Sequence, residues 1–116
     1  MTHPTSIYGI VAAAVWRRAE ASGKFSGTEH DLRDGFIHFS TAEQVAETAA
    51  RHYAGQTELL LVSVSAAQLG AALRWEPSRG GGLFPHLYAD LPLSAVTRVD
   101  PLPLAADGVH VLPRFD

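Results

Sequence analysis

The segment Phe36-Ile37-His38-Phe39-Ser40-Thr41 marks the point at which a short β-strand runs into a helix. Successive side chains of a strand point to opposite faces, so Phe36 and His38 share one face and Ile37 and Phe39 share the other. Both faces therefore carry large apolar groups. The pattern predicts a strand inside the fold, with His38 at least partly buried.

The residues after this strand carry a helix start signal. Ser40 and Glu43 have the S-x-x-E spacing of a capping box, in which the hydroxyl and the carboxylate each accept a backbone N–H. We expect a helix from here to about Ala54, and Gly55 is expected to end it.

On the N-terminal side of this junction we expect a strand, a helix and a loop. Residues 6–11 contain four bulky β-formers and predict the strand. Residues 12–21 place apolar side chains at spacings of three and four, which predicts a helix ended by Gly23. Residues 24–35 show no steady period and predict a loop.

On the C-terminal side, residues 58–65 give the clearest strand. Their apolar run Leu59-Leu60-Leu61-Val62 predicts burial on both faces and hence a central position in the sheet. Ser65 is expected to cap a short helix over residues 66–73. The remaining expected elements are a strand at 74–76, a mobile loop at 78–82, a strand at 83–88, a turn at 89–93 and an edge strand at 95–104.

The length and composition favour a single α+β domain. The chain has 116 residues, of which 47% are hydrophobic, and no cysteine. This length fits one domain, with its core over about residues 6–104 and a C-terminal tail at 105–116. Helices and strands are mixed without strict β-α-β alternation. We therefore expect a twisted, mainly antiparallel split sheet or partial barrel with two main helices.

The charge and hydropathy patterns exclude several functions. The net charge of −3 argues against general nucleic-acid binding and leaves a small-molecule ligand as the expected partner. No apolar stretch reaches the roughly 18 residues of a membrane span, and the polar N-terminus lacks a signal pattern, so we expect a cytoplasmic protein. The absence of cysteine excludes thiolate chemistry. Nothing in the sequence indicates the oligomeric state.

His38 is the first candidate site residue. A strand-to-helix junction offers backbone N–H groups and the positive end of a helix dipole. With Ser40 and Thr41 it would form a cradle for an anion or a ribose. The alternative is that His38 only hydrogen-bonds a neighbouring carbonyl and that Ser40 is only a cap.

A second group of candidates follows residue 75. Glu76, beside a tryptophan and before a glycine-rich loop, fits a general base or a ligand for sugar hydroxyls, and Arg79 in that loop fits a phosphate. His86 and Tyr88 point to one strand face and offer stacking surface and hydroxyl donors, with Tyr8 expected nearby. A solvated glutamate and an ordinary edge strand are the alternatives.

No metal site is expected, because the histidines show neither H-x-x-x-H nor H-E-x-x-H spacing. Asp31 and Asp34 lie in the predicted loop, without the regular acidic pattern of a calcium site.

The chain resembles a small bacterial family catalogued as domain of unknown function 952, from Ile7 to about Leu104. The resemblance is carried by Ile7-Tyr8, Trp16, residues 34–41, Gln44, residues 73–76 and Phe84-Pro85-His86-Leu87-Tyr88.

A more distant resemblance is to the RNA 2′-phosphotransferase branch of the ADP-ribosyltransferase-like proteins. It rests on the order of Ile37-His38-Phe39-Ser40, a helix, the strand at 60–64 and then Trp75-Glu76 before a glycine-bearing loop. The resemblance implies a split sheet that binds NAD in a central cleft. It implies that His38 contacts the ribose or phosphate with Ser40 and Thr41 nearby, and that Tyr8 or Tyr88 stacks on the nicotinamide. This chain lacks the basic residues of the RNA-acting enzymes.

Three functions remain open. The first is an NAD-using ADP-ribosyl-type transferase acting on a small molecule, with His38 and Glu76 as catalytic residues. The second is a non-catalytic module that binds a nucleotide or another small metabolite in the same pocket. The third is a protein-interaction domain using the apolar edge at residues 92–104.

Overall fold

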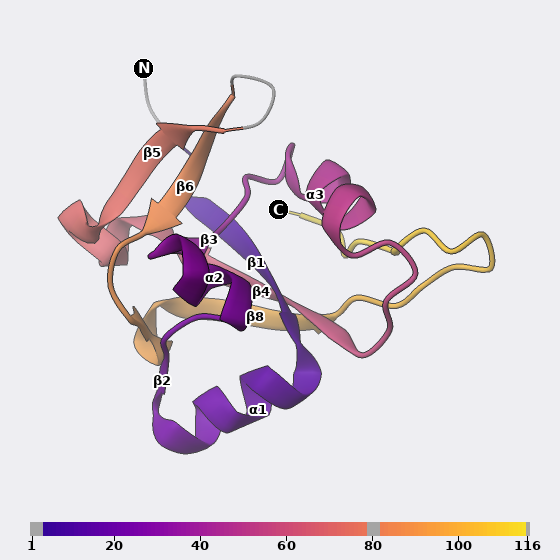
Figure 1. Cartoon of the computed structure of the whole chain (residues 1–116), viewed down its shortest axis with the longest axis horizontal. Helices are drawn as coiled ribbons and strands as arrows, with labels where there is room; N and C mark the ends of the chain where they lie inside the picture. The colour runs from indigo at the N-terminus through magenta and orange to yellow at the C-terminus, as the bar shows by residue number, and fades with distance from the viewer. Residues whose placement is uncertain (1–3, 79–81, 116) are drawn as a thin grey trace.

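Two three-stranded antiparallel sheets form the framework of the molecule. The computed structural model describes residues 4–78 and 82–115. The first sheet has the order β1-β4-β8 and the second has the order β3-β6-β5 (Figure 1). The bounds of these strands are Ser6–Ala12 (β1), Leu59–Ser65 (β4), Val96–Pro101 (β8), Ile37–His38 (β3), Leu83–Leu87 (β6) and Leu73–Pro77 (β5).

Within residues 4–78 and 82–115, the two sheets meet at a single bridge between Tyr8 and Ser40. The Tyr8 N–H donates to the Ser40 carbonyl and the Ser40 N–H donates to the Tyr8 carbonyl, both at 2.8 Å. The predicted α+β class and the mainly antiparallel, split sheet are confirmed. The partial barrel is wrong for the described residues, because the sheets stay open at β8 and β5.

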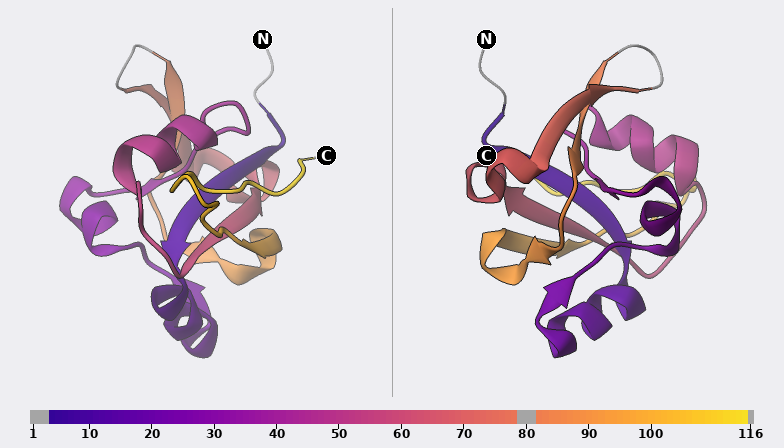
Figure 2. Two further views of the ribbon diagram at one scale, coloured as in Figure 1. Left: turned by 90° about the vertical axis from the view of Figure 1, so that its right-hand side faces the viewer. Right: turned by 60° about the vertical axis from the view of Figure 1, so that its left-hand side comes forward.

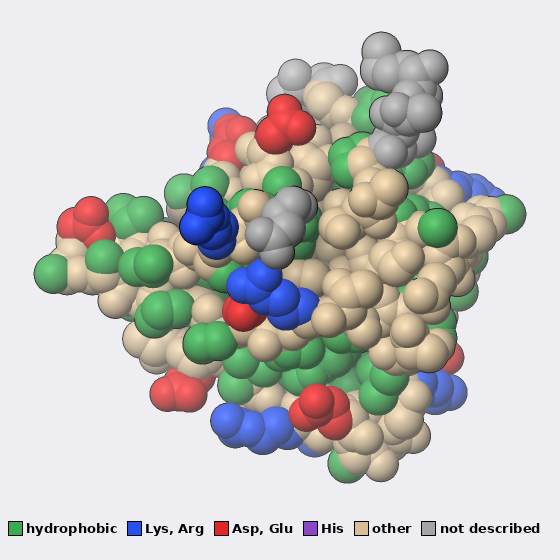
Figure 3. Space-filling view, turned by 180° about the vertical axis from the view of Figure 1, so that it is seen from behind, with side chains coloured by type: hydrophobic (Ala, Val, Ile, Leu, Met, Phe, Trp, Pro, Cys, Tyr) green, Lys and Arg blue, Asp and Glu red, His purple; other side chains and the backbone are tan. Residues whose placement is uncertain are grey.

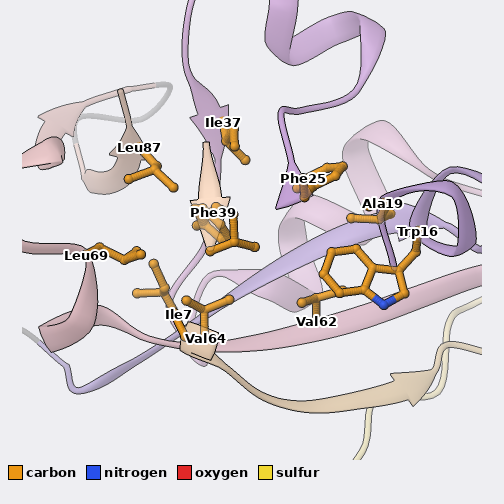
Figure 4. Close-up of a cluster of buried hydrophobic side chains, with 13 residues drawn as sticks. Ile7, Trp16, Ala19, Phe25, Ile37, Phe39, Val62, Val64, Leu69 and Leu87 are labelled. Atoms are coloured by element: carbon orange, nitrogen blue, oxygen red, sulfur yellow. The ribbon is translucent and has the colours of Figure 1, made fainter. Parts of the chain in front are cut away.

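The core lies on both faces of the first sheet. Ile7 and Val11 of β1 and Val62 and Val64 of β4 point into a cluster shared with Trp16 and the second sheet (Figure 4). The alternate positions of the same two strands point into another cluster, under α3. Strand β4 is therefore central and buried on both sides, as its apolar run predicts.

Helix α1 (Ala13–Ser22) buries Ala13, Trp16 and Ala19, and Gly23 ends it in the left-handed conformation at φ 91°. The predicted helix and its glycine stop are both confirmed. Helix α3 (Val45–His52) buries Val45 and Ala49 against the second cluster.

The loop predicted at residues 24–35 is wrong. The segment contains strand β2 (Lys24–Phe25), paired with β7 (Leu91–Pro92), and helix α2 (Glu29–Asp34). Helix α2 is short and mostly polar, so it has no apolar period. Instead, a capping box between Thr28 and Asp31 starts it and Gly35, at φ 86°, ends it.

The capping box predicted at Ser40 and Glu43 is also wrong. Both backbone groups of Ser40 are paired with β1, so this residue still belongs to the sheet, and α3 begins only at Val45. The reciprocal pair forms one residue later. The Thr41 N–H donates to Gln44 Oε1 at 3.0 Å, and the Gln44 N–H donates to Thr41 Oγ1 at 3.3 Å.

The C-terminal half follows the predicted order with smaller changes. Residues Ala66–Ala72 form the 3₁₀ helix η1, but Ser65 makes no side-chain cap bond. Strand β7 lies within the predicted turn at 89–93, and the 3₁₀ helix η3 (Leu93–Ala95) begins at its last residue. Strand β8 lies at the sheet edge, as predicted. The loop expected at 78–82 falls mostly outside the described residues.

The C-terminal segment, expected as a tail, packs on the domain. The ring of Phe115 lies 4.7 Å from the ring of Tyr8, and Leu112 joins the cluster under α3. Figure 2 shows this segment (yellow) running beside α3. In the rear view, apolar side chains lie along the arm that projects to the left (Figure 3). Val109 and Val111 of the C-terminal segment are exposed. No helix in residues 4–78 or 82–115 has the length and apolar character needed to cross a bilayer.

Candidate functional site

A groove of about 750 Å³ lies between α2 and α3. Its floor comes from β1 and β3, and its lining includes Tyr8, Trp16, His38, Ser40, Arg51 and His86. Figure 1 shows how the two helices flank β1. Pockets of this size hold small molecules and cofactors in other proteins.

His38 and His86 form the centre of the site. They are directly paired across β3 and β6, which puts both side chains on the same face of the second sheet. Their rings meet edge to face with centroids 5.7 Å apart. The predicted alternation is confirmed, because Ile37 and Phe39 point to the core while Phe36 contacts His38.

Glu76 lies behind His86, on the neighbouring strand β5. Its Oε1 is 2.8 Å from His86 Nδ1 and accepts the Tyr88 hydroxyl at 2.7 Å. An ionised carboxylate can only accept, so His86 Nδ1 carries the proton of this bond. Glu76, His86 and Tyr88 are thus one hydrogen-bonded unit, although Glu76 lies ten residues before His86 and twelve before Tyr88 in the chain.

An aromatic stack fills the space around this unit. The Phe36 ring lies 4.0 Å from the His86 ring, nearly parallel to it, and 5.3 Å from the Tyr88 ring. The guanidinium of Arg74 sits over the Tyr88 ring at 4.6 Å. The stack leaves the His86 and Tyr88 rings little freedom to turn. The two groups that donate hydrogen bonds to the Glu76 carboxylate are therefore held in place.

His38 is held between two carboxylates of α2. Its Nδ1 lies 2.6 Å from Asp31 Oδ1 and its Nε2 lies 2.9 Å from Asp34 Oδ2. The His38 backbone N–H also donates to Asp31 Oδ1, at 3.1 Å. Asp31 is buried, whereas Asp34 is exposed. The buried carboxylate therefore fixes the position of the imidazole, and Asp34 lies on its outer side.

The two partners shift each other's protonation. Burial by itself would lower the pKa of His38, but the hydrogen bonds and charges of Asp31 and Asp34 raise it overall. Burial would raise the pKa of Asp31, but the bonds it accepts from His38 and Thr28 lower it overall. His38 therefore keeps a proton to higher pH than an ordinary histidine.

Glu76 and Tyr88 shift each other in the same way. The Tyr88 hydroxyl, and after it His86, lowers the pKa of Glu76. The bond to Glu76 raises the pKa of Tyr88. Both groups lie toward solvent, and the Glu76 carboxylate stays ionised under ordinary conditions.

The structure brings some predicted site residues together and separates others. His38, Glu76, His86 and Tyr88 form one cluster, but of these four only His38 and His86 line the groove. Tyr8 and Ser40 also line it. Tyr8 does not lie beside His86 and Tyr88 as expected, because alternation along β1 turns its ring toward Phe115.

In the predicted cradle at Ser40 and Thr41, both backbone N–H groups are already paired within the protein. The Ser40 N–H is bonded to Tyr8 and the Thr41 N–H to Gln44, so neither is free for a ligand. Helix α3 also starts too late to direct its dipole at these residues. Thr41 is buried and does not line the groove, while Ser40 Oγ lies 3.0 Å from Thr48 Oγ1. Arg79 lies outside the described residues.

Sequence reasoning missed the acidic partners of His38 and a second histidine. His30 stacks on His38 with ring centroids 4.5 Å apart, and Asp31 and Asp34 bind the two nitrogens of His38. The signal for these residues is present in the sequence. Thr28-x-x-Asp31 followed by Gly35 predicts a short helix, and a helix places residues 30 and 34 on one face.

The arrangement can bind hydroxyl groups and move protons. Each of two adjacent imidazoles is oriented by a carboxylate, and both imidazoles face a groove. Imidazole–carboxylate pairs of this kind are common in general acid–base sites.

The model of the family described as "Protein of unknown function (DUF952)" matches residues 10–99. The chain belongs to this family. No curated protein matches it. Among solved structures, the chain is similar to an X-ray crystal structure and a solution NMR structure of protein CC0527 from Caulobacter crescentus. The X-ray crystal structure is 52% identical with a TM-score of 0.89, covering 92% of this chain and 94% of the other. The solution NMR structure is 53% identical with a TM-score of 0.82, covering 91% of each chain.

DUF952 membership fits the resemblance noted in the sequence, and the solved structures share the fold over nearly the full chain. The family description names no activity. The function must therefore be argued from the groove and its side chains.

Proposed function

We propose that this protein is an NAD-using ADP-ribosyl-type transferase that acts on a small molecule. The observation that carries the proposal is the His38 imidazole, fixed by the buried Asp31 and facing the groove beside His86. The distant resemblance to ADP-ribosyltransferase-like enzymes supplies the ligand class.

The groove residues fit a dinucleotide in charge and in hydrogen bonding. NAD carries a pyrophosphate, ribose hydroxyls and a cationic nicotinamide. The groove presents Arg33 and Arg51 for the pyrophosphate. It presents Asp31, Asp34 and Glu47 for the cationic nicotinamide. Both signs of charge are thus available in one lining.

Trp16 adds a second argument for a ligand in the groove. Trp16 lines the groove, and its indole N–H is buried without a hydrogen-bond partner among the described residues. A buried donor left unpaired costs about 1–3 kcal/mol, so an acceptor on a bound molecule would relieve this cost.

The roles follow from where the side chains lie. NAD supplies an ADP-ribosyl group, whose transfer places positive charge on the sugar carbon. His38 orients ribose hydroxyls through Nε2, and Ser40 and Tyr8 are further residues of the same lining. Glu76 acts through His86 as a positioning residue, because its carboxylate lies behind that ring. Tyr88 and Thr41 do not line the groove and act only through other residues: Tyr88 through its bond to Glu76, and Thr41 through its bond to Gln44.

One observation favours the alternative of a non-catalytic module that binds a nucleotide or another small metabolite. The carboxylate expected to stabilise a charged sugar carbon belongs to Glu76, which does not line the groove and already accepts two hydrogen bonds through one oxygen. A module would need His38 and the groove but not Glu76.

The experiment measures NAD binding by calorimetry and nicotinamide release by chromatography. We expect the wild-type protein to bind NAD and release nicotinamide. His38→Gln should bind about tenfold more weakly, as the loss of one hydrogen bond of about 1–1.5 kcal/mol implies. The absence of both binding and release at roughly millimolar NAD would overturn the proposal.

Glu76→Gln separates the enzyme from the module, with Glu20→Gln on the exposed face of α1 as the matched control. An enzyme should lose nicotinamide release in Glu76→Gln while keeping NAD affinity and while the control keeps both. Binding without release in all forms, the wild type included, supports the module.

A further inference from the structure

His30, Asp34 and His38 recur at intervals of four residues. The first two lie one turn apart on the same face of α2. Gly35 ends the helix in the left-handed conformation, and the chain then enters β3. There the His38 side chain lies against the face of α2 that carries His30 and Asp34. A helix and the strand after it thus direct two imidazoles and one carboxylate to one point.

The distances among these groups suit a metal ion. Nε2 of His38 lies 2.9 Å and Nε2 of His30 lies 3.7 Å from the same atom, Asp34 Oδ2. The ligand atoms of the three residues all lie within 4.8 Å of one another. Ligands about 2.0–2.2 Å from one ion are separated by about 3.0–3.5 Å. Small side-chain rotations would close this difference.

Asp31 provides the outer carboxylate that metal-binding histidines commonly have. It accepts from His38 Nδ1 at 2.6 Å, which leaves Nε2 as the atom that faces Asp34. In metal sites, such a bond fixes the tautomer and makes the imidazole a better ligand. Asp31 is itself fixed, because it is buried and its other oxygen accepts the Thr28 N–H at 2.8 Å.

The contact between His38 Nε2 and Asp34 Oδ2 requires a positive species. With the proton of His38 on Nδ1, both facing atoms are acceptors and would repel each other at 2.9 Å. Either a proton or a metal ion removes this repulsion. A proton between these two atoms needs no third group. The His30 imidazole nevertheless lies 3.7 Å from the same carboxylate oxygen, where it can act as a third ligand for a metal ion.

We propose that His30, Asp34 and His38 bind one divalent transition-metal ion of the zinc type, with Asp31 as the outer carboxylate of His38. Two imidazoles and one carboxylate suit zinc and its neighbours, whereas calcium and magnesium prefer oxygen ligands alone. All three residues line the groove, so an ion held there faces the groove. Three protein ligands leave a coordination position open, as in catalytic zinc sites.

Binding requires the exposed His30 ring to turn. The two imidazoles are nearly parallel, at 17°, and His30 Nδ1 is 3.3 Å from an Arg33 nitrogen. The His30 side chain is 53% exposed, so it can rotate and release Arg33 without disturbing the core. His38 stays in place because Asp31 holds it.

This inference does not depend on the proposed function, and its test contains no NAD. The two uses of His38 Nε2 exclude each other in one molecule, because an ion bound there takes the atom assigned above to a ribose hydroxyl.

The experiment titrates the full chain, stripped with a chelator, with Co²⁺ followed by visible absorption and with Zn²⁺ followed by calorimetry. We expect one equivalent of each ion to bind, with d–d bands for Co²⁺ and shifts of the His30 and His38 ring signals in NMR spectra. Asp31→Asn should weaken binding roughly 10–100-fold, and His30→Gln or Asp34→Asn by more than that.

His52→Gln is the matched control, because His52 is an exposed helical histidine on the other side of the groove. It should bind both ions as the wild type does. His30 and Asp34 are exposed, so circular dichroism should show all of these variants except Asp31→Asn fully folded. Absence of stoichiometric binding by the wild type, or equal binding by His30→Gln, Asp34→Asn and the control, would overturn the proposal in favour of a proton between His38 and Asp34.

Discussion

His38 and His86 are opposite residues on β3 and β6, and their rings meet edge to face at 5.7 Å. Each imidazole is held from behind by a carboxylate, Asp31 for His38 and Glu76 for His86. The strand pairing therefore joins two histidine–carboxylate pairs from distant parts of the chain into one site beside the groove.

The His38–Asp31 pair should make stability depend on pH in the metal-free protein. The pKa of His38 is raised above its ordinary 6.5, so its contribution is complete below about pH 6.5 and is lost as the pH rises through the folded pKa. The pKa of Asp31 is lowered below 3.8, so its contribution is present above about pH 3.8 and is lost as the pH falls through the folded pKa.

The free energy of unfolding of the wild type should therefore exceed that of His38→Gln most between about pH 4 and 6.5. We expect a difference of about 1–2 kcal/mol, in line with a partly buried charged hydrogen bond. Urea unfolding with a chelator present, repeated across this range, measures it. A difference that stays constant from pH 4 to pH 9 would contradict the pairing.

Tyr88→Phe should raise the pKa of Glu76 toward its ordinary value of 4.5. The Tyr88 hydroxyl is the largest cause of the lowered pKa, and Tyr88 is 39% exposed, so the fold should be unaffected. A carbon-detected NMR titration of the Glu76 carboxyl measures the change. Tyr53→Phe, which removes a hydroxyl that donates to the Ile10 carbonyl and makes no bond to Glu76, should leave this titration as it is. An unchanged pKa in Tyr88→Phe would show that the hydroxyl does not bind the carboxylate in solution.

Gly27→Ala should destabilise the protein through Asp31. A Cβ at this position would lie 2.8 Å from the Asp31 Cβ, and Gly27 has a φ of +112°, which suits only glycine. We expect a loss of about 2–3 kcal/mol in the free energy of unfolding, with a shift of the His38 ring signals in NMR spectra. Gly108→Ala is the control, because Gly108 also has a positive φ but nothing within 4 Å of the added Cβ. Equal losses in the two variants would mean that backbone strain alone is responsible.

Leu61→Ala should lower the free energy of unfolding by about 2–5 kcal/mol, because Leu61 is fully buried in the central strand β4. Leu32→Ala makes the same change at a residue that is 67% exposed, and it should cost less than about 0.5 kcal/mol. Thermal or urea unfolding of the two variants measures the contrast. A small effect at Leu61 would show that β4 is not the centre of the core.

The long apolar elements were predictable because their patterns are local. The run Leu59-Leu60-Leu61-Val62 predicts a strand buried on both faces, and the structure has β4 in that position. Helix α2 was missed because six mostly polar residues carry no apolar period, and a reciprocal cap at Thr28 and Asp31 starts the helix instead. The Ser40 capping box failed because pairing with Tyr8 keeps Ser40 in the sheet.

The candidate site was predictable only as a set of residue types. The sequence singled out His38, Glu76, His86 and Tyr88 from their positions at strand ends and on strand faces. It could not assign the partners Asp31 and Asp34, since these follow from how α2 packs beside β3. It also could not show that Glu76 stays outside the groove.

The sequence by itself determined the α+β class, the central strand, helix α1 with its glycine stop and the face on which His38 lies. Each of these features follows from the periodicity of a short segment or from the conformation of one residue. Both are set by residues close together in the sequence. Only the tertiary structure decided that His38 meets His86, that Asp31 is buried behind it and that Tyr8 turns toward Phe115. Those contacts depend on the register between distant strands and on the packing of short polar elements, and no local pattern encodes either.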